Sequence, residues 1–471
     1  MNRRNNPEER YTRMTMDPVS RLIPSLAIPT IISMMITALY NMADTFFVGK
    51  INTSATGAVG IVFPLMTIIQ IVGMTLGVGS GSYVARLLGT KNAERAGKST
   101  STAFFLALAF GLCLTVVGKS FLDTLMLLLG STDTILPYAK AYAGNVLFGA
   151  PFMAASFVMN VNLRSEGSAF LAMVGIASGA ILNIALDPVF IFVFGLGIGG
   201  AAIATVLSQI LSFCILLSHY LRKRSALRIS PKSFSLDHEM IVQIVSGGLP
   251  TLFRQSVATL SAIILNTAAG VYGDAAVAGM SVVTRVIMFM GSVLIGFGQG
   301  FQPVAAFNYA AGFHRRVYDA FRFAVKTGTV FLAVFSVTCG VFAPHVVRVF
   351  RNDPEVVRVG TVALRWQCAT LPLSAFIVIS NMMFQYIGKP LKASILALSR
   401  QGLAFIPTIL LLSRILGLFG IEISQAVSDF ATFLLAIPLT IGTLKTMKGS
   451  LDGRGEGEPD NKDTVKAFLD E

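Results

Sequence analysis

The sequence predicts an all-α polytopic membrane protein with twelve transmembrane helices in two six-helix bundles, and three observations predict it. Of the 471 residues, 54% are hydrophobic and only 13% are charged, whereas soluble domains carry roughly 25% charged residues. The apolar residues form long continuous runs, which favours helices over the short alternating strands of a β-barrel. Finally, the two halves of the chain carry matching residues at one constant spacing.

Twelve apolar stretches are long enough to span a bilayer, because about 20 apolar residues cross roughly 30 Å of hydrocarbon. The polar segment 1–20 precedes them and has no apolar signal-peptide core. We expect residues 445–471, which are charged and rich in glycine, to form a flexible tail. The predicted spans are 22–47, 56–80, 99–120, 138–161, 168–193, 196–220, 242–267, 276–300, 321–345, 359–384, 392–413 and 418–443.

Lys and Arg gather in alternate connections between the spans, and the positive-inside rule places those connections in the cytoplasm. Both termini are then cytoplasmic. Loop 221–232 is the strongest basic patch, for which we expect anionic membrane lipid as the partner. This distribution explains the net charge of +13 better than nucleic-acid binding does, although one outer cluster breaks the rule, at Arg348, Arg351 and Arg358.

A repeat divides the chain, because four pairs of residues each differ by 221 in number: Pro29 and Pro250, Pro151 and Pro372, Asn160 and Asn381, and Gly167 and Gly388. The run Gly77–Gly81 echoes the run Gly296–Gly300 with an apparent two-residue slip. Six spans per half give both halves the same orientation, and such parallel repeats are common in secondary transporters. The predicted division is 1–20 as a cytoplasmic segment, 21–220 and 241–444 as the bundles, 221–240 as a basic linker, and 445–471 as the tail.

Two glycine motifs suggest a nucleotide site, but neither fits one. Residues 195–200 contain G-x-G-x-x-G between two apolar helices, with no preceding strand. The stretch that ends in Gly97, Lys98 and Ser99 has Asn92 where a P-loop requires glycine. We therefore expect no nucleotide partner, and we expect an ion gradient to supply the energy.

Acids inside the first-half spans are the most informative residues, since a carboxylate near the bilayer centre costs about 2.5 kcal/mol or more. Asp44 lies in the first span, Asn183 and Asp187 lie one turn apart in the fifth, and Thr205 follows Ala201 by one turn in the sixth. If they converge, their oxygens suit Na⁺. Two close carboxylates can equally share a proton.

Plainer interpretations of these acids remain open. Asp44 precedes Lys50 by only six residues and could reach the outer interface. Asp187 could be a helix-terminal acid beside a turn, although Pro188 also removes a backbone donor there and can leave carbonyl groups free for a cation.

The second half has no counterparts of these acids. At the offset of 221, Asp44 corresponds to Leu265 and Asp187 corresponds to Thr408, while Asn183 corresponds to Ala404. We therefore expect ion coupling in the first half only.

The second half instead carries cations. We expect Arg254 and Arg400 to snorkel from cytoplasmic span ends, and the deeper Arg285 to pair with an acid or a dipole. Asp429 and Glu422 in the last span are the nearest acids.

Polar residues around Pro303 are candidates for a cytoplasmic gate. These are Gln299, Gln302 and Asn308, and plain interhelical hydrogen bonding is the alternative. Pro29 gives the first helix a place to bend. Weaker candidates for the substrate cavity are Met34, Gln255, Arg285, Asn160, Asn381 and Asp429.

Four motifs over roughly residues 20–445 resemble the MATE (multidrug and toxic compound extrusion) family, and its bacterial MepA-like branch in particular. They are LYNMADTFFVGK (39–50), LNIALDPVF (182–190), GLGIGGAAIAT (195–205) and GQGFQPVAAFNYAAG (298–312). The resemblance implies a V-shaped pair of bundles that exports lipophilic organic cations by alternating access in exchange for H⁺ or Na⁺. It also implies a monomer without a cofactor, in the bacterial cytoplasmic (inner) membrane.

The family's ion site uses an acid in the first span, Asn and Asp in the fifth and Thr in the sixth, which match Asp44, Asn183, Asp187 and Thr205. Some relatives carry a further acid in the seventh span, and this chain has none there.

Two other functional classes were weighed against transport of cations. A lipid-linked saccharide flippase of the same wider superfamily would need a cationic cavity, for which Arg254, Arg285 and Arg400 are available, but such chains commonly carry additional spans. A membrane-embedded enzyme would need a catalytic set, and the sequence offers no histidine cluster and no nucleophile beside a base.

Overall fold

A computed structural model describes residues 7–222 and 224–452. Within these residues twelve helical segments are long and apolar enough to cross a membrane, and they coincide with the twelve predicted spans. The predicted fold class is confirmed. The first half comprises α1 (Pro7–Met16), α2 (Val19–Gly49), α3 (Thr53–Gly89), α4 (Ala93–Ser120), α5 (Leu122–Leu128), α6 (Leu136–Ser165), α7 (Ala169–Pro188), the π-helical turn η2 (Val189–Val193) and α8 (Gly197–Leu221).

The second half follows a short 3-10 turn, η3 (Pro231–Ser233), in the linker. It comprises α9 (His238–Gly270), α10 (Asp274–Ala310), α11 (His314–Val341), α12 (Ala343–Phe350), α13 (Pro354–Tyr386), α14 (Pro390–Leu398), the π-helical turn η4 (Ser399–Leu403), α15 (Phe405–Leu416) and α16 (Leu418–Asp452).

Local sequence signals explain where several helices begin. The side chain of Asn52 accepts the backbone N–H of Ala55 at 2.7 Å and so caps α3. Asp353 caps α13 in the same way and is followed directly by Pro354, a residue that suits the first helical position. Hydropathy sets the length of each span, and these caps set its start.

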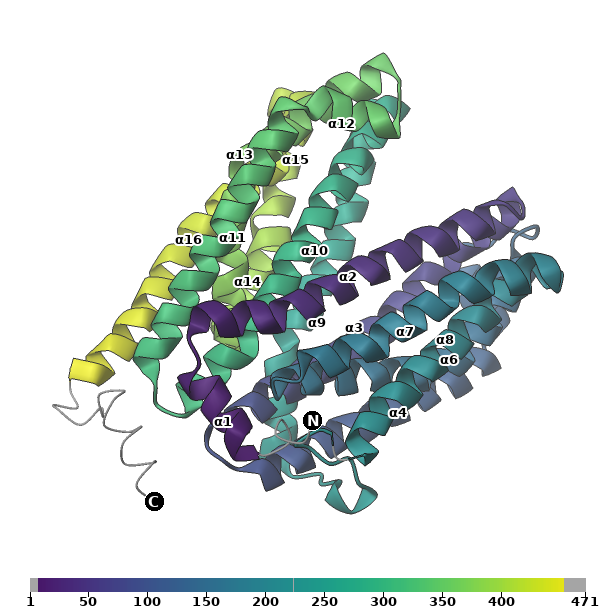
Figure 1. The fold of residues 1–471 in the computed structure, drawn as a ribbon. Coiled ribbons are helices and arrows are strands. Elements are labelled where there is room, and N and C mark those ends of the chain that lie inside the picture. Colours follow the sequence, from purple (N-terminus) through teal and green to yellow (C-terminus); the bar gives the residue numbers. More distant parts are fainter. Residues whose placement is uncertain (1–6, 223, 453–471) are drawn as a thin grey trace.

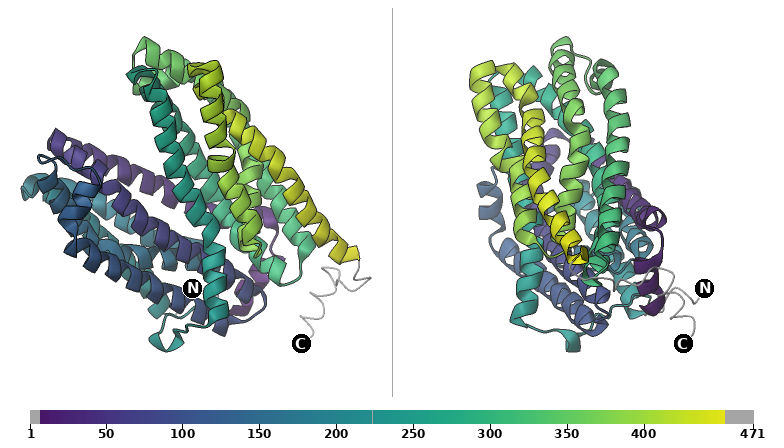
Figure 2. Two further views of the ribbon diagram at one scale, coloured as in Figure 1. Left: turned by 180° about the vertical axis from the view of Figure 1, so that it is seen from behind. Right: turned by 90° about the vertical axis from the view of Figure 1, so that its left-hand side faces the viewer.

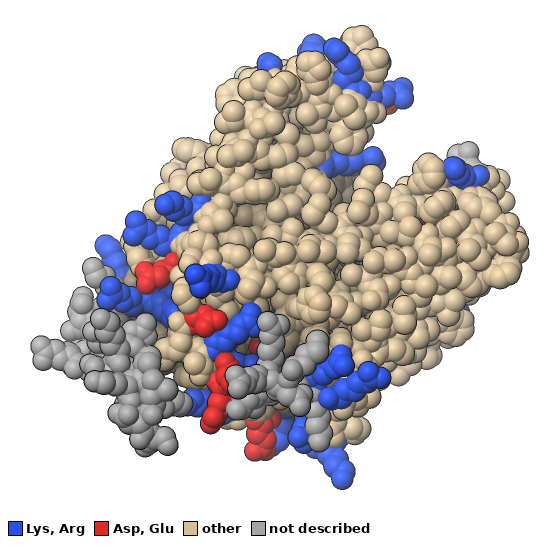
Figure 3. Space-filling model, in the orientation of Figure 1, with Lys and Arg blue, Asp and Glu red and all other residues tan. Residues whose placement is uncertain are grey.

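The helices form two bundles that meet at one end and diverge at the other, so the molecule is V-shaped (Figures 1 and 2). Helix α1 and the last turns of α16 lie at the closed end, and α12 lies at the open end of the second bundle (Figure 1). On the face drawn in Figure 3, charged side chains gather mainly near the ends of the bundles, and uncharged surface covers most of the area between them.

The first long helix of each half packs against the other half. Helix α2 packs against α10, and α9 packs against α3. A Cβ atom added at Gly300 would lie 2.6 Å from the backbone nitrogen of Ala27, and one added at Gly79 would lie 3.0 Å from that of Gly248. Only glycine permits these close backbone approaches.

These contacts correct one reading of the repeat. Gly79 and Gly300 differ by 221, as do Ala27 and Gly248, so the glycine pattern needs no two-residue slip. The slip arose because the two glycine runs were aligned by residue type alone. In the structure, Gly79 and Gly300 are equivalent because each packs against the first long helix of the other half. The repeat therefore continues through both contacts without a shift.

Asn160 and Asn381 occupy equivalent places and make equivalent hydrogen bonds. Asn160 donates to the carbonyl of Ala172 at 2.9 Å, and Asn381 donates to the carbonyl of Ala393 at 2.6 Å. Both amides tie a long helix to the helix that follows it. This geometry supports a structural role for the pair rather than the cavity role considered from the sequence.

The chain remains helical beyond the start of the predicted tail. Helix α16 continues to Asp452, although the flexible tail was expected to begin at residue 445. The helix persists because Met447 is buried in a hydrophobic core to which both halves contribute, and Thr443 accepts a hydrogen bond from Lys392 at 2.8 Å. The rest of that tail, 453–471, lies outside the described residues, as do residues 1–6 and 223.

Candidate functional site

A cluster of polar side chains lies in the first bundle, toward the open end of the V. Asp44 stands five residues before the end of α2. Asp187 lies in the last turn of α7, and Thr205 lies in the third turn of α8. The exposed fractions are 1% for Asn183, 0% for Asp187 and 5% for Thr205, so these three side chains are shielded from solvent and lipid.

Asn183 connects the two other buried residues. Its amide fits best with nitrogen directed at Asp187 Oδ2, at 3.0 Å, and oxygen accepting the backbone N–H of Thr205 at 3.2 Å. In the opposite orientation the amide nitrogen lies 3.3 Å from Thr205 Oγ1, and the amide oxygen faces Asp187. The first orientation suits an ionised carboxylate, because the amide then donates to a negative charge.

Asp44 completes the cluster from a third helix. Its Oδ1 atom is buried and has no hydrogen-bond partner among the described residues. The carboxyl lies within electrostatic range of Asp187. It does not reach out to Lys50, whose ammonium instead lies 4.4 Å from the centre of the Phe46 ring. The structure therefore gives no support to the interface alternative for Asp44.

Two tyrosines that the sequence analysis missed surround the acids. Tyr40 and Tyr142 both lie within electrostatic range of Asp44 and Asp187. Tyr40 could have been found, because it precedes Asp44 by one helical turn and so shares its face. Tyr142 gave no such signal, since one tyrosine in an apolar span is ordinary.

Small residues bring α7 and α8 close enough to form this cluster. A Cβ atom at Gly179 would lie 2.8 Å from the carbonyl oxygen of Ser208. Ala201 is fully buried in the hydrophobic core at the open end of the first bundle. Ala201 therefore acts as a spacer, since its methyl group offers no ligand atom. Helix α7 ends at Pro188, which lacks a backbone donor, and passes into the π-helical turn η2.

The chemistry of the cluster is that of a small cation or proton site. It presents two carboxylates, an amide and a hydroxyl, and no ion pair joins either acid to a Lys or Arg in the described part of the chain. Hard cations such as Na⁺ prefer oxygen ligands of this kind. Within residues 7–222 and 224–452, no group of three His, Cys, Asp or Glu side chains could hold a metal.

The closed end of the V is joined by polar contacts between the bundles. Arg164 of α6 donates to Gln299 of α10, and the hydroxyl groups of Ser165 and Tyr386 lie 3.4 Å apart. The last two residues differ by 221 in number, so the approximate two-fold axis of the repeat passes between them. Arg86 of α3 adds a hydrogen bond to Gln243 of α9 at 3.0 Å.

The three gate candidates on α10 have different surroundings. Gln299 bridges the bundles as just described. Asn308 donates to the carbonyl of Met14 at 3.0 Å and so fixes α1. Gln302 is buried but makes no side-chain hydrogen bond with a described residue. Gln299 fits the gate interpretation, and Asn308 fits interhelical bonding.

Glu166, which the sequence analysis missed, fastens α1 to the same end. Its side chain is fully buried and pairs with Arg10 at 2.9 Å. It also accepts hydrogen bonds from the Ser225 hydroxyl at 2.8 Å and the Ala226 N–H at 2.9 Å. The residue closes α6 beside a turn, and nothing in the sequence there indicates a buried partner.

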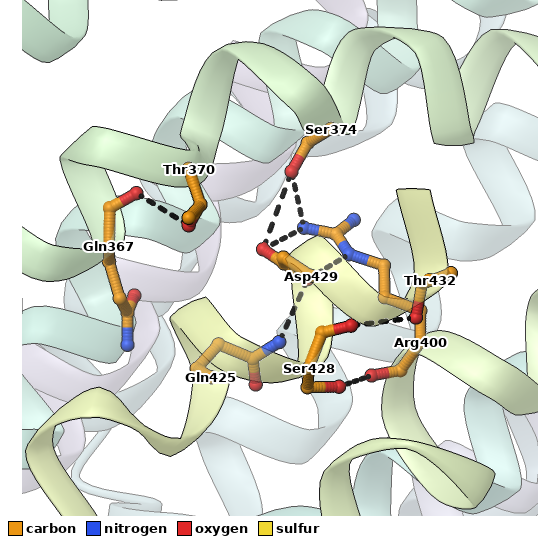
Figure 4. A network of polar contacts seen from close by, with 8 residues as sticks. All are labelled: Gln367, Thr370, Ser374, Arg400, Gln425, Ser428, Asp429 and Thr432. Carbon is orange, nitrogen blue, oxygen red and sulfur yellow. Dashed lines mark hydrogen bonds and ion pairs between the residues drawn. The ribbon is translucent and has the colours of Figure 1, made fainter. Parts of the chain in front are cut away.

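Arg400 does not snorkel toward an interface, and that expectation was wrong. Its guanidinium pairs with Asp429 at 3.0 Å and donates to the Ser374 hydroxyl at 3.0 Å (Figure 4). Gln425 also donates to Asp429, at 3.1 Å. Arg400 lies ten residues from the start of its span at Pro390, and the ion pair compensates its charge there.

The other second-half arginines also differ from expectation. Arg254 lies sixteen residues from each end of α9, since that helix runs from 238 to 270, so it is not near a cytoplasmic end. Arg285 is exposed and makes no hydrogen bond or ion pair with a described residue, so the pairing expected for it was wrong. Met34 and Gln255 are partly exposed, and neither side chain makes a polar contact within the described ranges.

Comparisons with known proteins agree with this architecture. The chain is 25% identical over 451 residues to the multidrug export protein MepA of Staphylococcus aureus (strain N315), covering 94% of this chain and all of the relative. It resembles a crystal structure of MATE in the bent conformation, with a TM-score of 0.88 and 27% identity over 94% of this chain and 99% of that one.

A second similar structure is the outward-facing conformation of a multidrug resistance MATE family transporter, with a TM-score of 0.85 and 26% identity over 95% of this chain and 98% of that one. The MatE family model matches residues 29–189 and 250–411, which together make up most of the two bundles. The chain belongs to the MatE family.

Proposed function

We propose that this protein is a multidrug exporter that exchanges lipophilic organic cations for H⁺ or Na⁺ across the bacterial inner membrane. The observation that carries the proposal is the pair of acids Asp44 and Asp187. Asp187 is buried, Asp44 has a buried carboxylate oxygen, and neither forms an ion pair with a Lys or Arg among the described residues. Membership of the MatE family and the similarity to a multidrug export protein support transport over enzymatic activity. Twelve apolar helices and a bacterial relative support the membrane location.

Asp44 and Asp187 can favour exchange because their negative charges attract both the coupling ion and the organic cation. With no cation present, two carboxylates in a site of low dielectric repel each other, and a proton or Na⁺ relieves that repulsion. The same negative charge attracts an organic cation in the cleft and so strengthens its binding. Linkage then requires that the drug and the coupling ion weaken each other's binding by one common factor.

The orientation of the Asn183 amide can change with the species that is bound to Asp187. When Asp187 is ionised, the amide nitrogen donates to it. When Asp187 is protonated, the amide can turn over so that its oxygen accepts from the carboxyl and its nitrogen reaches Thr205 Oγ1. Na⁺ favours the same turned orientation, because amide and carboxylate oxygens then face the ion together. Both orientations use partners that are already in place.

The molecule is open on the side opposite α1 and the last turns of α16. If the basic connections are cytoplasmic, as their charge predicts, this conformation faces outward. Alternation then requires the closed-end contacts, such as Arg164–Gln299, to separate. Pro29 leaves the carbonyl of Ser25 without its helical donor, which gives α2 a place to bend at that turn.

The proposal is tested by ethidium efflux from proteoliposomes under separately imposed pH and Na⁺ gradients. We expect one gradient to drive efflux in the wild type, and we expect Asp44→Asn and Asp187→Asn each to abolish that dependence. Glu422→Gln is the matched control, because it neutralises another buried membrane acid in the second bundle. Coupled efflux retained in both Asp variants would remove these acids from the mechanism. Replacing Na⁺ by choline identifies the ion.

The flippase alternative receives no such support. A cavity for a pyrophosphate-linked lipid requires several free cations, but Asp429 already neutralises Arg400, and the chain has twelve candidate spans in its described residues.

A further inference from the structure

A cavity of about 910 Å³ lies at the closed end of the first bundle, where α1 meets the start of α2 and the start of α7. Its volume is within the range of pockets that hold small organic ligands. The acids Asp44 and Asp187 lie near the other ends of α2 and α7. The proposed ion site therefore does not account for this cavity.

The two sides of the cavity differ in chemistry. One side belongs to α1 and the linker and includes Arg13 and Arg224, whereas the other is apolar and includes Pro29 of α2 and Phe170 of α7. Pro29 lies ten residues beyond Val19, the start of α2, which is about 15 Å along the helix. Phe170 is 61% exposed in a candidate membrane span. Because the headgroup layer of one leaflet is only roughly 6 Å thick, the cavity extends from the membrane surface to the depth of the hydrocarbon.

The charged side carries an excess of positive charge. Among the described residues that line the cavity, three are arginines and two are glutamates. The side chain of Glu166 is fully buried and pairs with Arg10 at 2.9 Å, so these two charges compensate each other. Arg13 and Arg224 then outweigh Glu9 by one positive charge. The lining therefore favours a ligand with a negative charge.

The start of α7 adds hydrogen-bond donors to this lining. Ser168 is the N-cap residue of α7, but its side chain makes no capping hydrogen bond. The N–H groups of Ala169 and Phe170 have no acceptor among the described residues, as is usual in the first turn of a helix. A helix start also carries a partial positive charge that favours phosphate groups. These donors reinforce the charge of the two arginines.

We propose that this cavity binds the headgroup of an anionic phospholipid from the cytoplasmic leaflet. The phosphate accepts hydrogen bonds from Arg13 and Arg224, because guanidinium groups match phosphate oxygens in geometry and charge. The acyl chains follow the apolar side past Phe170 into the bilayer. The basic connections place this end of the molecule in the cytoplasm, where the leaflet carries anionic lipid. The proposal is independent of the transported substrate.

Brominated lipids test the site, because bromine quenches tryptophan fluorescence on contact. The full-length protein with Trp366→Phe and Phe170→Trp has a single tryptophan, which lines the cavity. It is reconstituted in phosphatidylcholine vesicles that contain a rising fraction of brominated phosphatidylglycerol or, in a parallel series, brominated phosphatidylcholine. The variants added to this protein are Arg13→Gln, Arg13→Lys and Arg224→Gln. Arg228→Gln is the matched control, because Arg228 is an exposed arginine of the same linker that does not line the cavity.

We expect phosphatidylglycerol to be preferred over phosphatidylcholine about tenfold, and each Arg→Gln variant at the cavity to lower this preference about fivefold. Arg13→Lys keeps the charge and should keep the preference, as should Arg228→Gln. Equal quenching by both lipids in the parent protein, or equal losses in Arg13→Lys and Arg13→Gln, overturns the proposal. Relief of quenching by millimolar glycerol phosphate would identify a soluble phosphate as the ligand and would also overturn it. Ethidium efflux from the same vesicles tests the proposed function separately.

Discussion

The backbone contact at Gly300 gives the sharpest prediction about the closed end of the cleft. A Cβ atom there would lie 2.6 Å from the nitrogen and 2.7 Å from the Cα of Ala27, whereas ordinary contact begins at 3.4 Å. Gly300→Ala therefore forces α10 and α2 apart by roughly 0.8 Å, the difference between 3.4 and 2.6 Å. Overpacking of this kind costs about 1–3 kcal/mol. The closed-end conformation should lose about 5- to 150-fold in relative population.

Spin labels on the two loops of the open end measure that population. Cysteines introduced at the exposed positions Asp133 and Asn352, after replacement of the four native cysteines by serine, report the separation of the bundles by pulsed electron paramagnetic resonance. We expect Gly300→Ala to shift the distribution toward shorter distances. Gly291→Ala on the same helix is the control, since its Cβ would meet nothing within 4 Å. Identical distributions and melting temperatures in the two variants would refute the packing argument.

Three further predictions concern stability, each measured as the thermal unfolding midpoint of the protein in detergent. Glu166→Gln breaks the buried ion pair to α1 and should destabilise the protein by about 1–3 kcal/mol; an unchanged midpoint would show that α1 is not held there. Asn160→Leu and Asn381→Leu should each cost about 0.6 kcal/mol and leave coupled efflux intact, whereas lost efflux with normal stability would place them in the cavity. Asp429→Asn leaves Arg400 unpaired and should cost about 3–5 kcal/mol; a smaller loss than for Asn381→Leu would contradict a structural ion pair.

The spans were predictable because the membrane imposes one strong local constraint. A helix such as α3 must present a long apolar run, and that run is visible in the sequence without knowledge of its neighbours. The ends were less certain, because packing can extend a helix beyond its apolar core. Met447, which is buried beyond the predicted end of the last span, is such a case.

The first-bundle cluster was partly predictable for a related reason. Polar residues are rare in apolar helices, so Asp44 and Asp187 stood out, and the structure brings them within electrostatic range. The roles assigned to them in ion coupling remain predictions. Tyr142 and Glu166 were missed because their positions, in an apolar span and beside a turn, are unremarkable until the tertiary partners are known.

The arginines show where reasoning from a single span fails. Hydropathy locates Arg400 in a helix but says nothing about Asp429, which is 29 residues away in the next span and forms its counter-ion. Pairing between spans is a property of the packed bundle. The same limit applies to Arg254, whose lack of a hydrogen bond or ion pair within the described residues is a property of the packed bundle.

The central claim is that a coupling ion and an organic cation compete through the acids of the first bundle. The most direct measurement is the dissociation constant of ethidium for the purified protein, titrated against Na⁺ at fixed pH and against pH without Na⁺. We predict that ethidium binding weakens as the coupling ion rises in the wild type and that this dependence disappears in Asp187→Asn. An ethidium affinity that is independent of both ions in the wild type, or an ion dependence that persists in the variant, would contradict the account.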